Sequence, residues 1–157
     1  MPNSDFRPYP GNFGEEYIVL HRTLPATAIT AAGTTTVYLP TVASPVSAFP
    51  ELLYYKGGAL VLGGTAPSFT QATTARVAKR TSGGVVTGLS GYVTIATGGA
   101  TGTVYVFPAL AGATDSQLTV RPNSSDNIIV EIVNAATGTV ITQPSDVLVG
   151  VKVAALK

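Results

Sequence analysis

The last third of the chain, residues 117–156, consists of β-branched runs separated by short polar turns. Residues 127–133 and 147–153 are the longest runs, and 139–142 is a shorter one. Branched Cβ atoms favour extended backbone and pack well on a pleated surface, so these runs predict strands. In the final run valine occupies every second position, namely Val147, Val149, Val151 and Val153. Side chains alternate between the two faces of a strand, so we expect these valines to face a core.

The other face of that final strand carries Leu148, Gly150 and Lys152. Along this face the strand carries a large apolar side chain, then a glycine without a side chain, and then a charged side chain. Such a sequence suits close approach of a neighbouring surface, followed by solvent.

The rest of the chain repeats the strand-and-turn pattern. Further strands are expected at 17–22, 34–39, 59–62, 75–78, 85–89, 92–97, 103–107 and 118–121. Residues 51–56 fit either one or two helical turns after Pro50 or a strand at 52–55, and their aromatic content favours the strand. Short strands with turns every 8–12 residues or so are typical of sandwiches and barrels. The sequence therefore predicts an all-β fold, an antiparallel β-sandwich of jelly-roll or Greek-key type.

Glycine precedes three Thr/Val-rich segments, and proline follows each of them. The glycines are Gly33, Gly102 and Gly138, and the prolines are Pro40, Pro108 and Pro144. Glycine supplies the positive φ that tight turns need, and proline ends strand pairing. The pattern predicts three turns, and its unequal spacing does not indicate a repeat architecture.

Residues 1–16 form a distinct segment before the single sandwich domain expected at 17–157. The segment is rich in proline and glycine, which favour extended backbone over regular structure. Sixteen extended residues reach about 50 Å, whereas a domain of this size has a radius of gyration near 15 Å or so. We expect an extended N-terminal arm able to reach a neighbour. A frayed terminus or a cover for a strand edge is the alternative, and the rings of Phe6, Tyr9 and Phe13 favour docking.

Composition excludes several classes of partner. Charged residues make up 11% of the chain and the net charge is +1, so no nucleic-acid partner is expected, because nucleic-acid binding needs a clustered basic face. No apolar run reaches the 18 or so residues of a membrane span, and no signal-peptide pattern opens the chain. Synthesis in a cytoplasm is expected. Low net charge promotes association, which indicates a protein that packs against others.

No catalytic or metal-binding pattern emerges. His21 is the single histidine and falls in an expected strand, and no G-x-S-x-G motif provides a nucleophile. Cysteine is absent, and the spacing of Asp115, Asn123, Asp126 and Asn127 does not match a calcium loop. We therefore expect no enzyme activity, no cofactor and no metal.

The whole chain, cysteine-free and rich in Ala, Thr, Gly and Val, with a Pro/aromatic arm before a β-sandwich, resembles the decoration (cement) proteins of tailed-bacteriophage capsids. The resemblance lies in composition and layout. It implies a non-catalytic structural virion protein on the capsid exterior, contacting the major capsid protein and bridging neighbouring subunits. It also implies a homotrimer, although composition fits a trimer and a dimer equally.

On this hypothesis the arm carries the capsid contacts. Phe6, Tyr9, Phe13 and Tyr17 insert into apolar pockets, and Arg7 pairs with a capsid carboxylate. The alternative is a glycan- or receptor-binding β-sandwich of a phage head fibre or tail, with some of the seven tyrosines as stacking platforms. Tryptophan is absent, and Tyr38, Tyr92 and Tyr105 fall in expected strands.

Overall fold

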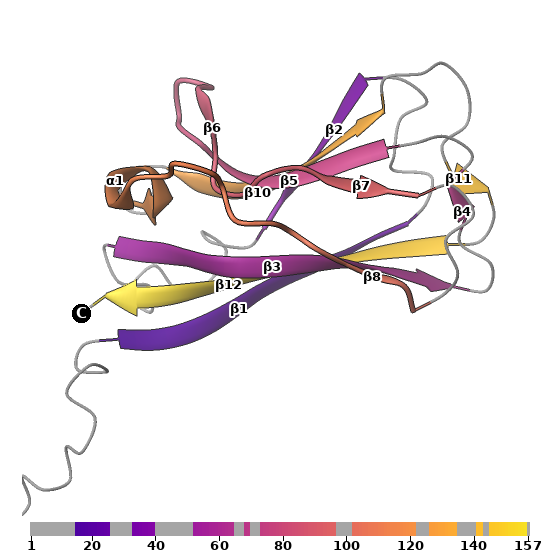
Figure 1. Cartoon of the computed structure of the whole chain (residues 1–157), viewed down its shortest axis with the longest axis horizontal. Helices are drawn as coiled ribbons and strands as arrows, with labels where there is room; N and C mark the ends of the chain where they lie inside the picture. Colours follow the sequence, from indigo (N-terminus) through magenta and orange to yellow (C-terminus); the bar gives the residue numbers. More distant parts are fainter. Residues whose placement is uncertain are drawn as a thin grey trace, which may run out of the picture.

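The computed structural model describes residues 15–25, 33–39, 52–64, 68–69, 73–96, 102–121, 126–134, 141–142 and 145–156. Within these ranges it contains twelve strands and the four-residue helix α1 (Asp115–Leu118). Every strand pair is antiparallel. Figure 1 shows two stacked sheets, with α1 at one end and the small β4–β11 pair at the other. The predicted antiparallel β-sandwich is confirmed.

The first sheet has the order β1–β12–β3–β8, and β9 also pairs with β3. Its strands are β1 (Glu15–Pro25), β12 (Ser145–Leu156), β3 (Leu52–Gly64), β8 (Val104–Val106) and β9 (Thr119–Val120). The second sheet has the order β2–β10–β5–β6, and β7 also pairs with β5. Its strands are β2 (Gly33–Tyr38), β10 (Asn127–Asn134), β5 (Thr73–Arg80), β6 (Val86–Gly88) and β7 (Val93–Ile95). A third pair joins β4 (Ser68–Phe69) and β11 (Ile141–Thr142).

The path of the chain through the two main sheets is that of a jelly roll. The chain passes from β1 to β2, β3 and β5 by changing sheet each time, and it stays in the second sheet through β6 and β7. It then changes sheet again at β8, β10 and β12. A double sheet in which a chain winds this way is the jelly-roll form of the sandwich.

Two predicted elements differ from the structure. The separate strands expected at 52–55 and 59–62 are one strand, β3, so the strand alternative at 51–56 is correct and the helical one is wrong. A bulge at Lys56 and Gly57 shifts the register with β12, and Gly57 adopts a φ of +136° there. The strand expected at 118–121 is shorter, because Thr114 caps α1 by accepting a hydrogen bond from the Gln117 N–H and Leu118 ends the helix.

The core lies between the two main sheets. The four alternating valines of β12 are fully buried, as predicted. They form one cluster with Leu53, Leu60 and Leu62 of β3 and with Ile128, Val130 and Ile132 of β10. Gly33 and Gly102 have the positive φ values expected at their turns, +100° and +85°, whereas Gly138 lies outside the described residues.

Polar contacts join the two sheets at their margins. Arg22 Nη1 of β1 donates to the Tyr38 carbonyl of β2 at 3.0 Å. Lys79 Nζ of β5 donates to the Thr119 carbonyl of β9 at 2.6 Å and to the Ser116 carbonyl at 3.2 Å. Burial lowers the pKa of Lys79, because the charged form loses part of its hydration.

The close packing of β3 on β12 requires glycine at position 58. A Cβ there would lie 2.6 Å from the Gly150 carbonyl oxygen and 3.3 Å from Phe107 Cδ2. Since the first of these atoms is backbone, Gly58→Ala forces the strands apart and should lower the free energy of unfolding by about 1–2 kcal/mol in urea denaturation. Gly150→Ala is the matched control, because a Cβ at Gly150 meets nothing within 4 Å. A loss of stability in the control equal to that of Gly58→Ala would contradict the explanation.

Candidate functional site

The residues expected to contact a capsid fall almost entirely outside the described part of the chain. Phe6, Arg7, Tyr9 and Phe13 lie outside the described residues. Tyr17 lies in β1, and its backbone pairs with Ala154 of β12. The arm therefore stays a prediction. Strand β1 itself begins at Glu15, before the expected domain start.

The outer face of the first sheet carries an apolar surface that joins four strands. The register places Leu148 of β12 beside Val61 of β3, and Val61 beside Val104 of β8. In the next row of the same face, Gly150 pairs with Ala59 and Ala59 pairs with Val106. We call the following set the apolar face: Val19, Ala59, Val61, Val104, Val106, Leu148 and Gly150.

The large side chains of this apolar face are unusually exposed. Val106 is 66% exposed, Val19 62%, Val104 55% and Leu148 39%. The other exposed large hydrophobic residues in the described part of the chain, Val85, Tyr38 and Tyr92, lie elsewhere. Single exposed apolar residues are ordinary, but a group on one sheet face marks an interaction surface.

The centre of the apolar face carries only small residues, so larger side chains beside it stand out further from the sheet. Gly150 has no side chain, its ladder partner Ala59 has only a methyl group, and the space above Gly150 is open. Leu148, Val61 and Val104 form a higher row along one side. A face with a small-residue centre allows another backbone to approach closely, as the alternation in β12 predicted for Gly150.

Ionisable groups on this side of the first sheet lie beside the apolar face, with His21 on β1, Lys152 on β12 and the exposed Lys56 on β3. His21 pairs with Gly150, and Lys152 pairs with Val19, with both His21 and Lys152 exposed. The rows from β12 to β8 hold only valine, leucine, alanine and glycine. Burying those rows against a partner therefore removes no charge from water, which avoids the main penalty of forming an interface.

The outer face of the second sheet is different, because polar contacts cover it. Arg76 Nε and Glu131 Oε2 form an ion pair at 2.7 Å, and the Arg76 guanidinium lies 4.7 Å from the centre of the Tyr92 ring. Arg80 Nη1 donates to the Tyr38 hydroxyl at 2.7 Å. Two of the expected strand tyrosines, Tyr38 and Tyr92, thus stand exposed beside arginines, whereas Tyr105 packs against the core.

The described residues offer no constellation that points to catalysis. His21 is exposed on β1, and no group of three or more His, Asp or Glu side chains within the described ranges is arranged to hold a metal ion. No helix in that part of the chain is long and apolar enough to cross a membrane. What the arrangement can do is present a surface to a partner.

Sequence reasoning foresaw only the β12 part of the apolar face. Val104 and Val106 flank Tyr105 in a run that predicts a strand, but alternation alone does not say which side is covered. That depends on β8 being an edge strand beside β3, which only the pairing reveals.

Comparisons with known proteins give distant matches. No protein-family model and no curated protein sequence matches the chain. Among solved structures it is similar to that of Cocksfoot mottle virus, with a TM-score of 0.48 and 8% identity over 91% of this chain and 84% of that chain. Desmodium yellow mottle tymovirus gives a TM-score of 0.39 at 8% identity, over 91% and 88% of the two chains. The Gx strain of infectious bursal disease virus gives 0.37 at 16% identity, over 89% and 31%. At TM-scores below 0.5 these likenesses support neither a family nor a function.

Proposed function

We propose that this chain is a non-catalytic structural virion protein that docks on the exterior of a capsid and bridges neighbouring subunits. The observation that carries this proposal is the exposed apolar face of the first sheet. The partner that covers this face is a capsid subunit, and more specifically the major capsid protein of a tailed bacteriophage. The jelly roll is compatible with this role but does not select it, since lectin domains share the fold.

Energetics favour a protein partner for the apolar face. Fully burying a valine or leucine side chain contributes about 1.5–3 kcal/mol. Four such side chains stand exposed on this face, and their combined contribution is of the size needed to offset the loss of rotational and translational freedom on association. The low net charge of +1 removes the electrostatic repulsion that keeps many proteins apart.

The arm supplies a second attachment in this proposal. Phe6, Tyr9, Phe13 and Tyr17 would occupy apolar pockets on an adjacent subunit, with Arg7 beside a carboxylate. A second contact on a tethered segment forms intramolecularly, so modest contacts add to strong overall binding. A homotrimer would add further attachments and strengthen overall binding again. Size-exclusion chromatography with light scattering distinguishes a trimer from a monomer.

The decisive experiment measures binding to undecorated phage heads by co-sedimentation. Val106→Glu and Leu148→Glu each place a carboxylate on the apolar face. Binding of the capsid partner would bury this carboxylate without a cation beside it, so each variant should weaken binding about tenfold or more. Thr94→Glu is the matched control, because Thr94 is an exposed strand residue of β7 in the second sheet. Wild-type occupancy of the heads by both face variants would refute the proposal.

Deleting residues 1–14 tests the arm in the same assay, since the deletion leaves β1 intact from Glu15. Reduced occupancy with unchanged folding is expected. Unchanged occupancy would remove the arm from the proposal and leave the apolar face to be judged by its own variants.

A second candidate function is binding of a glycan or receptor. Its supporting observation is the pair Tyr38 and Tyr92, 40% and 50% exposed on the outer face of the second sheet and held by Arg80 and Arg76. Fixed aromatic rings can stack on apolar sugar faces. A glycan array distinguishes this candidate: a hit lost in Tyr92→Ala supports it, and clean negatives exclude it.

A further inference from the structure

A cavity interrupts the first sheet beside β3. Strand β9 pairs with β3 at Leu53 and Tyr54, and β8 pairs with β3 from Ala59 to Val61. Between them the chain leaves the edge of β3 and crosses to the second sheet, where Ala109 forms a bridge with Ser90. This detour leaves a cavity of about 380 Å³ beside residues 55–58, within the 300–1,000 Å³ or so of known small-molecule sites.

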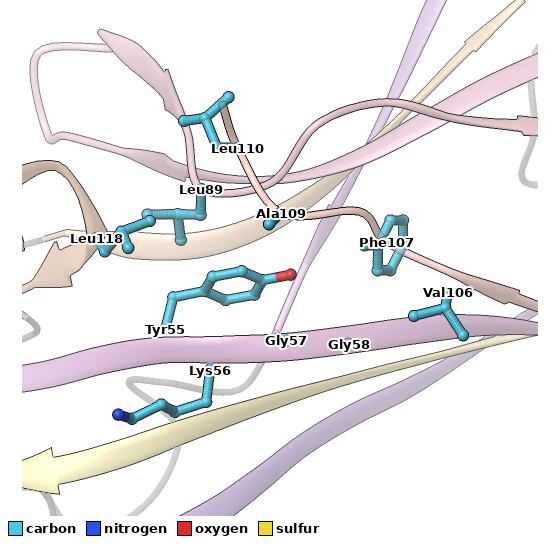
Figure 2. A pocket seen from close by; sticks show the side chains of 10 residues that line it. All are labelled: Tyr55, Lys56, Gly57, Gly58, Leu89, Val106, Phe107, Ala109, Leu110 and Leu118. Carbon is cyan, nitrogen blue, oxygen red and sulfur yellow. The ribbon is translucent and has the colours of Figure 1, made fainter. Parts of the chain in front are cut away.

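The walls of the cavity are mainly apolar. Figure 2 shows the Tyr55 ring lying between β3 and the segment that carries Ala109, while the Lys56 side chain points to the opposite side of the strand. Lys56 Nζ instead lies 4.8 Å from the centre of the Tyr54 ring. The apolar side chains of the lining are Leu89, Val106, Phe107, Ala109, Leu110 and Leu118. Val106 and Ala109 are exposed, so the cavity opens to solvent beside them.

One polar atom in the cavity lacks a partner. The Tyr55 side chain is only 6% exposed, and its hydroxyl makes no hydrogen bond within the described part of the chain. The hydroxyl of nearby Ser90 accepts from the Val77 N–H at 2.8 Å and gives its own proton to the Gly91 carbonyl at 2.9 Å, so it has no proton to donate to Tyr55. Buried hydroxyls without partners are uncommon, and each calls for an explanation.

The orphan hydroxyl is a donor. Burial is the main cause that raises the pKa of Tyr55 to about 12, and the nearby Ser90 hydroxyl acts in the other direction. The proton therefore stays on the oxygen at neutral pH. An apolar cavity with a single hydrogen-bond donor suits an uncharged molecule that carries one hydrogen-bond acceptor.

We propose that this cavity binds an uncharged, mostly apolar small molecule whose carbonyl oxygen accepts a hydrogen bond from the Tyr55 hydroxyl. Ketones, esters and amides with a short aliphatic or aromatic body share this chemistry. The proposal does not depend on the apolar face, since the cavity and the orphan hydroxyl stand without it.

The test titrates acetophenone and cumene, which have similar size and differ in the carbonyl, into the ¹⁵N-labelled full chain. Saturable amide shifts are expected at the lining residues with acetophenone. Tyr55→Phe should weaken acetophenone about tenfold, the effect of losing one buried hydrogen bond, and leave cumene unchanged. Ala109→Phe fills the cavity and should abolish both; if it does not fold, Leu110→Trp replaces it.

Three results would overturn the proposal. One is the absence of saturable shifts at the cavity with acetophenone. Another is equal acetophenone affinity in wild type and Tyr55→Phe, with both spectra showing a folded protein. Binding outside the cavity, seen as shifts that Ala109→Phe does not remove, counts against it in the same way.

Discussion

Val149→Asp is expected to lower the free energy of unfolding by roughly 3–5 kcal/mol. Val149 is fully buried in β12, which lies between β1 and β3. An aspartate there loses its hydration among the buried valines and leucines of the core. Arg22 is the ladder partner of Val149, but its guanidinium already donates to the Tyr38 carbonyl. Since whole domains are stable by only about 5–15 kcal/mol, urea denaturation should show a large share of the stability gone.

Leu148→Asp provides the matched control for this prediction. Leu148 is the next residue along β12, and it points to the outer face with 39% of its surface exposed. The same carboxylate is solvated there, so the loss should stay within about 1 kcal/mol. Equal losses in the two variants would mean that the assignment of the valines to the core is wrong.

The strands that could be predicted from the sequence are those whose residue pattern lies within one short segment of the chain. The alternation in 147–153 marks both the strand and its buried face, because a period of two has only one structural explanation. At 127–133 the β-branched run predicts a strand, and β10 runs from Asn127 to Asn134. At 51–56 local propensity left two alternatives, and the pairing with β12 decides between them.

The apolar face and the cavity, on which the proposals rest, could not be predicted, because they depend on strands distant in sequence. The apolar face exists only because β1, β12, β3 and β8 are neighbours in that order. The cavity exists because residues between β8 and β9 leave β3 and meet Ser90. No periodicity encodes either arrangement. The contact roles of the arm residues Phe6, Arg7, Tyr9 and Phe13 rest on composition alone, and they stay a prediction.

The fold also sets how the two proposed sites relate to each other. Val106 belongs to the apolar face and also lines the cavity. A partner that covers β8 would therefore cover one edge of the opening. Occupancy of the cavity and docking on the apolar face are thus expected to influence each other, and the Val106→Glu variant changes the surroundings of both.

Tyr55→Phe is expected to stabilise the protein, and by more as the pH rises. At neutral pH the variant removes a buried hydroxyl without a partner, so the free energy of unfolding should rise by about 1 kcal/mol. Above pH 10 the unfolded wild-type chain loses the Tyr55 proton, whereas the folded chain keeps it up to about pH 12. The unfolded state then binds fewer protons than the folded one, so the stability of wild type falls as pH rises through this window.

Each unit of pKa difference corresponds to about 1.4 kcal/mol, so the extra loss in wild type reaches roughly 2–3 kcal/mol by pH 12. Urea denaturation of both proteins at pH 7, 10, 11 and 12 measures it. The difference between variant and wild type should be constant up to about pH 10 and then widen. Tyr92→Phe, which removes an exposed tyrosine, controls for the loss of one phenol. Destabilisation by Tyr55→Phe at neutral pH would show that the hydroxyl has a partner after all, and the cavity would then lose the donor on which its ligand depends.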